Sequence, residues 1–371
     1  MNSRSIAVSS AFLIMFGWNS VENFMSFYLS NFLTNSDIST IFISIYLPFA
    51  LFSLIAVNVM QRPRHMVTIG SILYIPFMLT IALNPNKVLL TIFGILVGIG
   101  ASLFFIGCSY YVLQSERKGR SAGIFTASIS AGSGLAGISG GYFLLKHPFH
   151  DLFILGAVVL STGSILSLLL KDVILNINIK TVELLRRKEI VKVGVLTFLG
   201  ILFYGLSKSF VPIVTKEIGG NVFDVGIYAF TLVIFSLTVA MVGGELTDRI
   251  GRKFGFYVVM ILSALCSFIV FFANNVFLIF IAGTIFSFVN VLTRTVSLAT
   301  MGDLMDGLTA GALVMFFTSL SAVFSLALFG FTQNPRLPFL IVGVLSLLSL
   351  GLAKTLKVIK MSAHTVKNGI R

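Results

Sequence analysis

Residues 254–293 read FGFYVVMILSALCSFIVFFANNVFLIFIAGTIFSFVNVLT, forty residues without one charged side chain. A membrane-spanning helix needs about 20 apolar residues, so this stretch is long enough for two of them. Ala273-Asn274-Asn275 supplies polar turn residues near its middle. We therefore predict a transmembrane hairpin with spans at 254–273 and 276–298.

The rest of the chain has the same character. Of 371 residues, 57% are hydrophobic and 11% are charged, too few to cover a water-soluble protein of this size. The formal net charge is +13, but the basic residues stand in short clusters between apolar runs, which argues against nucleic-acid binding. Cys108 and Cys266 lie far apart inside apolar runs and indicate packing residues, with no metal site.

Apolar runs of spanning length continue in both directions, and with the hairpin they predict twelve membrane spans. The other ten are expected at 7–31, 38–60, 66–84, 88–112, 121–144, 152–170, 190–214, 223–244, 308–331 and 337–354. The fold class is thus an all-α membrane protein.

The basic residues also predict the orientation, because cytoplasmic loops are enriched in Lys and Arg. With the N-terminus inside, twenty of the twenty-six basic residues fall in cytoplasmic segments. The outer loops carry only Lys87, Lys146, Lys216 and Arg336. We expect a multi-pass cell-membrane protein with cytoplasmic N- and C-termini.

The longest polar stretch lies between the sixth and seventh spans and divides the chain. We expect a six-helix bundle at 1–170, a cytoplasmic connector at 171–189, a second six-helix bundle at 190–356 and a cytoplasmic tail at 357–371. Gly119-Arg120-Ser121-Ala122-Gly123 at the fifth span is echoed by Gly307-Leu308-Thr309-Ala310-Gly311 at the eleventh. Such internal symmetry is typical of transporters built from six-helix repeats.

A motif follows the eighth span: Gly244-Glu245-Leu246-Thr247-Asp248-Arg249-Ile250-Gly251-Arg252-Lys253. It resembles the major facilitator superfamily signature G-x-x-x-D-R-x-G-R-K at every defined position. A basic cytoplasmic loop would explain Arg249 and Arg252, but it would not explain Asp248 or the spaced glycines. The corresponding loop of the first half, Gln61-Arg62-Pro63-Arg64-His65, has basic residues and no aspartate.

The resemblance implies two pseudo-symmetric six-helix bundles and a cytoplasmic gate. In that architecture span two pairs with eleven and span five with eight, so Asp248 would face Arg117 and Arg120 at the start of span five. In the other pair we hypothesise that the charges are exchanged: the basic residues Arg62 and Arg64 lie on the loop of the first half, and they meet the acidic Asp303 and Asp306 before span eleven. The alternative is that either aspartate only caps span eleven. The implied gate residues are Gly244, Asp248, Arg249, Gly251, Arg252, Arg62, Arg64, Arg117, Arg120, Asp303 and Asp306.

Span five carries small residues at close spacing: Gly132, Ala136, Gly137, Gly140 and Gly141. They resemble a degraded form of the family's antiporter motif, G-x-x-x-G-P-x-x-G-G, with Gly137 where proline is usual. This would point to export. Close helix packing explains the same residues equally well.

Ionisable side chains inside the spans are the strongest functional signal, because each costs at least about 2.5–3.5 kcal/mol at the bilayer centre. Glu22 of span one and Lys208 of span seven lie at nearly the same depth. Glu22 precedes Arg62 by 40 residues and Lys208 precedes Arg249 by 41, so the two charges are near symmetry mates. We predict that they form a pair lining a central cavity and that Glu22 exchanges a proton; the alternative is a static buried ion pair.

Arg294 of span ten lies closer to the cytoplasmic end, so we expect no direct pairing with Glu22. We expect it to line the cavity; the alternative is that its side chain extends to the inner membrane interface. The predicted cavity residues are polar and share helix faces with these charges: Asn19, Glu22, Asn23, Ser26, Tyr204, Ser207, Lys208, Asn290 and Arg294.

Together these features predict a secondary transporter that moves a small organic solute by alternating access. We expect a monomer with protons as the coupling ion, efflux of small amphipathic compounds slightly favoured, and no metal or other cofactor. No P-loop and no catalytic constellation is present, so we expect neither ATP-driven transport nor enzymatic activity. The alternatives are uptake or exchange of an organic anion or sugar, and a non-transporting membrane sensor or receptor.

Overall fold

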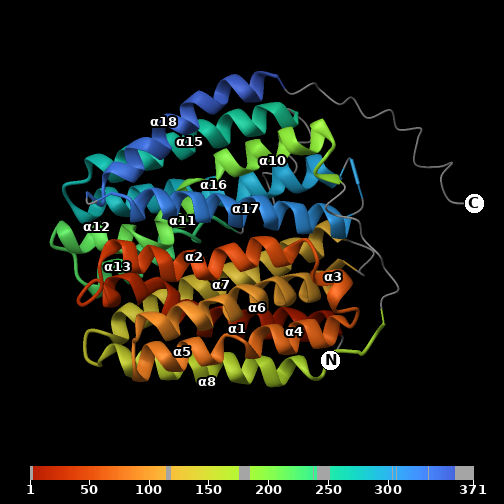
Figure 1. The fold of residues 1–371 in the computed structure, drawn as a ribbon, viewed down its shortest axis with the longest axis horizontal. Helices are drawn as coiled ribbons and strands as arrows, with labels where there is room; N and C mark the ends of the chain where they lie inside the picture. The colour runs from red at the N-terminus through yellow and green to blue at the C-terminus, as the bar shows by residue number, and fades with distance from the viewer. Residues whose placement is uncertain are drawn as a thin grey trace, which may run out of the picture.

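The structure is a computed structural model that describes residues 3–113, 118–174, 184–236, 238–239, 251–302, 304–305, 307–332 and 334–355. Within these residues the regular secondary structure is helical, as the sequence predicts. Nine described helical segments are long and apolar enough to cross a membrane. Figure 1 shows helices lying side by side along a common direction, which is the arrangement expected of a membrane-spanning bundle.

The first half of the fold, from α1 to α8, follows the predicted spans closely. Its helices are α1 (Ser3–Leu29), α2 (Asn35–Ser53), α3 (Ala56–Val59), α4 (Pro63–Ile72), α5 (Ile75–Leu83), α6 (Lys87–Leu113), α7 (Lys118–Phe143) and α8 (Phe149–Ser167). The predicted spans 38–60 and 66–84 are each divided, into α2 and α3 and into α4 and α5. The second break precedes Pro76, whose missing N–H cannot continue a helical ladder.

The second half runs from α10 to α18. Its helices are α10 (Lys188–Gly200), α11 (Phe203–Ser209), α12 (Val211–Glu217), α13 (Val222–Thr231), α15 (Arg252–Phe272), α16 (Val276–Gly302), α17 (Gly307–Gly330) and α18 (Leu337–Lys354). The predicted span 190–214 is divided as well, because its helix breaks after Gly200 and again at Phe210, before Pro212, while Lys188–Ser209 as a whole is long and apolar enough to cross a membrane. The breaks leave Lys208 in the last turn of the short helix α11.

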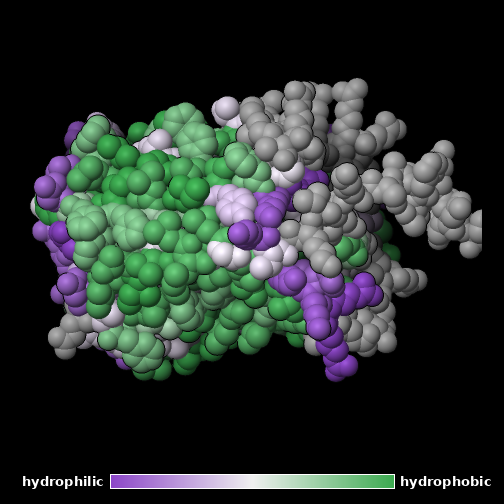
Figure 2. All heavy atoms as spheres, turned by 90° about the horizontal axis from the view of Figure 1, so that it is seen from above, coloured by the Kyte–Doolittle hydropathy of each residue, from purple (hydrophilic) through white to green (hydrophobic). Residues whose placement is uncertain are grey.

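Apolar side chains face outward along the sides of the bundle. On α8, for example, Leu155, Val158 and Ile165 are exposed although all are large and hydrophobic. Figure 2 shows hydrophobic residues covering the middle of one face, with hydrophilic residues gathered toward its ends. This distribution matches a protein whose sides contact lipid and whose ends contact water.

The two halves meet through the helix pairs that the family resemblance implies. Helix α2 packs against α17, and α7 packs against α13. The hydroxyl of Ser39 near the start of α2 donates to the carbonyl of Leu326 at 3.0 Å, and that of Ser53 at its end donates to the carbonyl of Ala312 at 3.4 Å. Helix α2 therefore contacts α17 along most of its length.

Candidate substrate and proton site

The second half inserts one lysine into the first half. Lys208 extends from α11, and its Nζ donates to Asn19 Oδ1 at 2.9 Å, to Asn23 Oδ1 at 2.9 Å and to Ser133 Oγ at 3.3 Å. Lysine has three donor hydrogens, so these three acceptors use all of them. Asn19 and Asn23 belong to α1 and Ser133 belongs to α7. The ammonium is therefore bound by neutral oxygens that all come from the other half.

Glu22 lies beside this ammonium and is also buried. Its Oε2 is 3.9 Å from Lys208 Nζ, and its Oε1 accepts a hydrogen bond from the hydroxyl of Tyr46 at 2.8 Å. Only 5% of Glu22 and 8% of Lys208 is exposed. The sequence prediction brings together the correct two residues, but the contact is an electrostatic one at the limit of an ion pair, and the strong hydrogen bonds go to other groups.

Two of these partners, Ser133 and Tyr46, are absent from the predicted site. Tyr46 comes from the next helix, α2, and Ser133 comes from α7, where it is one of several hydroxyl residues with nothing in the sequence to set it apart. Of the other predicted cavity residues, Ser207 donates to the carbonyl of Tyr204 in its own chain segment, and the buried Ser26 hydroxyl has no hydrogen-bond partner within the described residues. A polar residue that bonds back to its own helix gives no sequence signal that separates it from a ligand-binding one.

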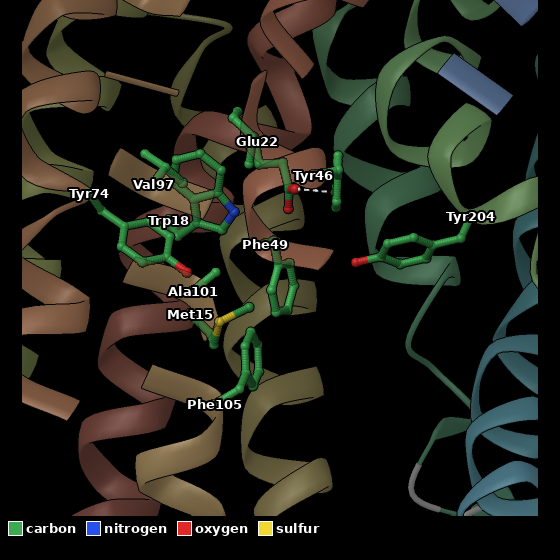
Figure 3. Close-up of a pocket in the computed structure, with 11 residues that line it drawn as sticks. Met15, Trp18, Glu22, Tyr46, Phe49, Tyr74, Val97, Ala101, Phe105 and Tyr204 are labelled. Carbon is green, nitrogen blue, oxygen red and sulfur yellow. Dashed lines mark hydrogen bonds between the residues drawn. The ribbon is translucent and has the colours of Figure 1, made fainter. Parts of the chain in front are cut away.

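A small aromatic pocket opens next to Glu22. It has a volume of about 40 Å³, which suits a few water molecules and excludes a larger solute. Figure 3 shows Glu22 at its edge, with the hydroxyl of Tyr204 directed toward it from the second half. Its lining residues are Met15, Trp18, Glu22, Ile45, Tyr46, Phe49, Tyr74, Val97, Ala101, Phe105 and Tyr204. All but Tyr204 come from the first half.

Arg294 contacts the site through an aromatic ring. Its guanidinium carbon lies 5.6 Å from the centre of the Tyr204 ring, within the range of a cation–π contact. Tyr204 in turn makes an edge contact with Tyr46, with 6.1 Å between ring centres. Asn290, one turn earlier on α16, has a buried Oδ1 without a hydrogen-bond partner in the described residues, and Arg294 Nε is in the same state. Arg294 thus faces the site without pairing directly with Glu22.

Comparison with known proteins identifies the family of this chain. The profile of the Major Facilitator Superfamily matches residues 7–194 and again residues 193–369. The chain belongs to the Major Facilitator Superfamily. The two matches together cover nearly all of both halves, which agrees with the six-helix symmetry expected from the sequence. No curated protein sequence matches the chain significantly.

Solved structures agree on the fold of this superfamily member. A POT family transporter in complex with a thioalcohol-conjugated peptide aligns with a TM-score of 0.77 at 14% identity, over 95% of this chain and 94% of that one. A POT family transporter in complex with 5-aminolevulinic acid gives 0.75 at 14%, over 95% and 96%. The nucleoside transporter NupG gives 0.70 at 12%, over 96% and 100%. At these identities the likeness shows that the chain shares its fold with these transporters.

The signature loop of the superfamily is described only at its end. Gly244, Asp248 and Arg249 lie outside the described residues, as do Arg117, Asp303 and Asp306. Gly251 has a φ of +104°, a left-handed conformation that favours glycine, and Arg252 begins α15 directly after it. Arg120 lies within α7. The predicted gate therefore remains a prediction.

The first-half loop makes a contact that the gate hypothesis did not include. Arg62 Nη1 and Arg64 Nη2 lie 3.4 Å and 3.2 Å from the same oxygen, Oδ2 of Asp172. Asp172 follows α8 at the start of the predicted connector, next to Lys171, whose carbonyl accepts a hydrogen bond from the hydroxyl of Tyr111 at 2.6 Å. Both arginines are thus paired with the start of the connector, and their predicted contact with Asp303 and Asp306 is untested because both aspartates lie outside the described residues.

The glycines of α7 allow close approach of neighbouring helices. A Cβ placed on Gly226 of α13 would stand 2.6 Å from the carbonyl oxygen of Gly137, and one on Gly132 would stand 2.6 Å from that of Phe12 on α1. No side chain fits at such distances. Packing therefore accounts for these small residues whether or not they also contribute to export.

Proposed function

We propose that this chain is a secondary active transporter that moves small amphipathic organic solutes by alternating access, with protons as the coupling ion and Glu22 as their carrier. The observation that carries the proposal is the buried contact between Lys208 of the second half and α1 of the first. Isolated ionised groups are expensive in a membrane interior, so a site that holds them is expected to have a function.

Alternating access gives this contact its role. The halves touch along α2–α17, along α7–α13 and between α1 and the α11–α12 segment. A rocking motion about these contacts would withdraw Lys208 from Asn19 and Asn23 and open the aromatic pocket to one side. The present pocket of about 40 Å³ suits a closed state in which no larger solute fits.

Proton coupling follows from the position of Glu22. Burial disfavours a charged carboxylate, and a nearby ammonium favours it. Withdrawal of Lys208 would remove the cation 3.9 Å away and leave only the hydroxyl of Tyr46 on the carboxylate. Proton uptake by Glu22 would then follow the opening of the halves, and proton release would accompany their closure.

A second candidate solute is an organic anion. Lys208 and Arg294 supply two cations against the single acid Glu22, and Arg294 Nε has no hydrogen-bond partner in the described residues. Efflux, the cell-membrane location and the cytoplasmic termini remain proposals that rest on the basic-residue distribution and on the glycine-rich α7.

Proteoliposomes with a pH-sensitive dye inside test the proposal. A panel of amphipathic amines, organic acids and sugars is added to vesicles under an imposed pH gradient, and proton flux is recorded for each compound. We expect compound-dependent proton flux that Glu22→Gln abolishes. The matched control is Glu217→Gln, because Glu217 is a partly exposed acid at the end of α12 that pairs with Arg336. Full compound-dependent flux in Glu22→Gln would eliminate Glu22 as the carrier.

A further inference from the structure

Lys208 behaves as a ligand of the first half. Four oxygens surround its ammonium: Asn19 Oδ1, Asn23 Oδ1, Ser133 Oγ and Glu22 Oε2. We call this set the ammonium cage. Every member belongs to α1 or α7, whereas the ammonium is delivered by α11. Any motion that separates the halves would empty the cage.

The cage is held in shape by bonds within the first half. Asn19 Nδ2 donates to the carbonyl of Met15 at 2.8 Å, and Asn23 Nδ2 donates to the carbonyl of Ser133 at 3.4 Å. These bonds fix both amide groups with their oxygens toward the ammonium. Ser133 Oγ donates to Asn19 Oδ1 at 2.7 Å, so its lone pairs remain free to accept.

The carboxylate of the cage is fixed in the same way, because Tyr46, also of the first half, donates to the other oxygen of Glu22 at 2.8 Å. None of these bonds depends on Lys208. The emptied cage would therefore be preorganised for another ammonium group and would lose little entropy on binding it.

We propose that the ammonium cage is the binding site for a primary amine on the transported solute and that Lys208 is its built-in competitor. This rests on the proposed function, since the cage becomes available only when the halves separate. Glu22 belongs to the cage and also lines the aromatic pocket. A solute with an ammonium group and a short apolar or aromatic body would fill both. A bare metal cation would use the cage and leave the pocket unoccupied.

The competition has a mechanistic consequence. When no solute is bound, Lys208 can neutralise Glu22 and satisfy the amide oxygens, so the empty protein can close and reopen. Without Lys208, an empty closed state would bury the Glu22 carboxylate with only the hydroxyl of Tyr46 to balance it and would leave Asn23 Oδ1 without its donor, which is costly. Removal of the lysine amine should therefore strengthen amine binding and restrict the protein to exchange of one solute for another.

Isothermal titration of the purified full-length protein in detergent tests the competition. The probe is 2-phenylethylamine, with 2-phenylethanol and 3-phenylpropionate as neutral and anionic analogues of the same size. We expect Lys208→Met to bind the amine at least about tenfold more tightly than the unchanged chain, because the competitor no longer occupies the site. Neither analogue should gain affinity. Adding Asn23→Ala to Lys208→Met should remove most of the gain.

Lys216→Met is the matched control. Lys216 also joins the halves, since it donates to Asn31 Oδ1 at 2.7 Å and Ser30 Oγ at 3.1 Å, but it lies outside the cage. If easier opening alone caused the gain, Lys216→Met would show it too. Should Lys208→Met not give folded protein, Lys208→Gln provides the same comparison, because an amide leaves the carboxylate without a fixed cation.

Three results would overturn the proposal. The first is unchanged or weaker amine binding in the Lys208 variants, and the second is a larger gain in affinity for 3-phenylpropionate than for the amine. The third is that sodium chloride and choline chloride reduce the binding of the amine to the same extent. The titration uses neither a membrane nor a pH gradient. A gain in amine affinity without proton flux in proteoliposomes would reject the proposed proton coupling and retain the cage. Proton flux without a gain in amine affinity would retain the coupling and reject the cage.

Discussion

Two clusters in this protein each combine basic and acidic side chains, but they differ in burial and in the parts of the protein that they connect. Lys208 and Glu22 are buried and join the two halves. The short hydrogen bonds of Lys208 are donated to neutral oxygens. Arg62 and Arg64 with Asp172 are partly exposed, with 46%, 31% and 32% of their side chains accessible, and they join the first half to the adjoining start of the connector. The first cluster connects the two halves, whereas the second connects one half to the segment that follows it.

The two clusters are expected to differ in how much each contributes to the free energy of the contact between the halves. Exposed ion pairs contribute about 0–1 kcal/mol each, whereas removing one partner of a buried pair costs about 3–5 kcal/mol. Asp172 stands at the start of the connector, next to Lys171, whose carbonyl accepts a hydrogen bond from the hydroxyl of Tyr111 in the first half at 2.6 Å, so we expect the Asp172 contact to move with the first half. We therefore expect the Lys208 contact to bias the equilibrium between states and the Asp172 contact only to position its loop.

The largest effect is expected from the buried cluster. Lys208→Met and Glu22→Gln should each lower the free energy of unfolding by up to about 3–5 kcal/mol, because each leaves one buried charge behind. The double variant leaves neither, so its loss should be well below the sum of the two. Denaturation of the three variants in detergent micelles measures this coupling. Additive losses would mean that the two groups do not interact.

An intermediate effect is expected at the uncharged contact between α7 and α13. Gly226→Ala should destabilise the protein by about 1–3 kcal/mol, because the added Cβ would overlap the backbone of Gly137. Gly311→Ala is the matched control, since a Cβ there meets nothing within 4 Å and alanine favours a helix. Thermal unfolding should move in opposite directions for the two variants. A shift of the same sign in both would contradict the close approach.

The smallest effect is expected from the exposed cluster. Asp172→Asn should change the free energy of unfolding by about 1 kcal/mol or less, with transport preserved, because both ion pairs are partly solvated. Increasing salt should weaken the contact in the unchanged chain and have little further effect on the variant. A restriction to exchange like that predicted for Lys208→Met would show that this loop takes part in the motion between states.

The sequence predicts the parts of this architecture that depend on composition. The uncharged stretch 254–293 becomes α15 and α16, and the near-symmetric positions of Glu22 and Lys208 bring them to one site. These predictions succeed because lipid forces helices of defined length and because ionised groups must avoid it.

The partners of the charges could not be predicted in the same way. Ser133 reaches the site through the packing of α7 on α1, and Tyr46 reaches it from α2, which packs on α6 and α17; a polar side chain in a span gives no sign of its direction. The breaks at Gly200 and Phe210 are also set by packing, although Pro212 marks one of them. Asp172 was not expected as the partner of Arg62 and Arg64 because contacts between loops have no periodicity.

The most direct measurement is the distance between the halves at the end of the molecule where α1 terminates. Spin labels on Phe32→Cys and Asn274→Cys, both exposed positions, would report it once the buried Cys108 and Cys266 are replaced by alanine. We predict that Lys208→Met shifts the distribution of label separations toward longer distances, while Asp172→Asn leaves it unchanged. An unaltered distribution in Lys208→Met would contradict the view that this lysine holds the halves together.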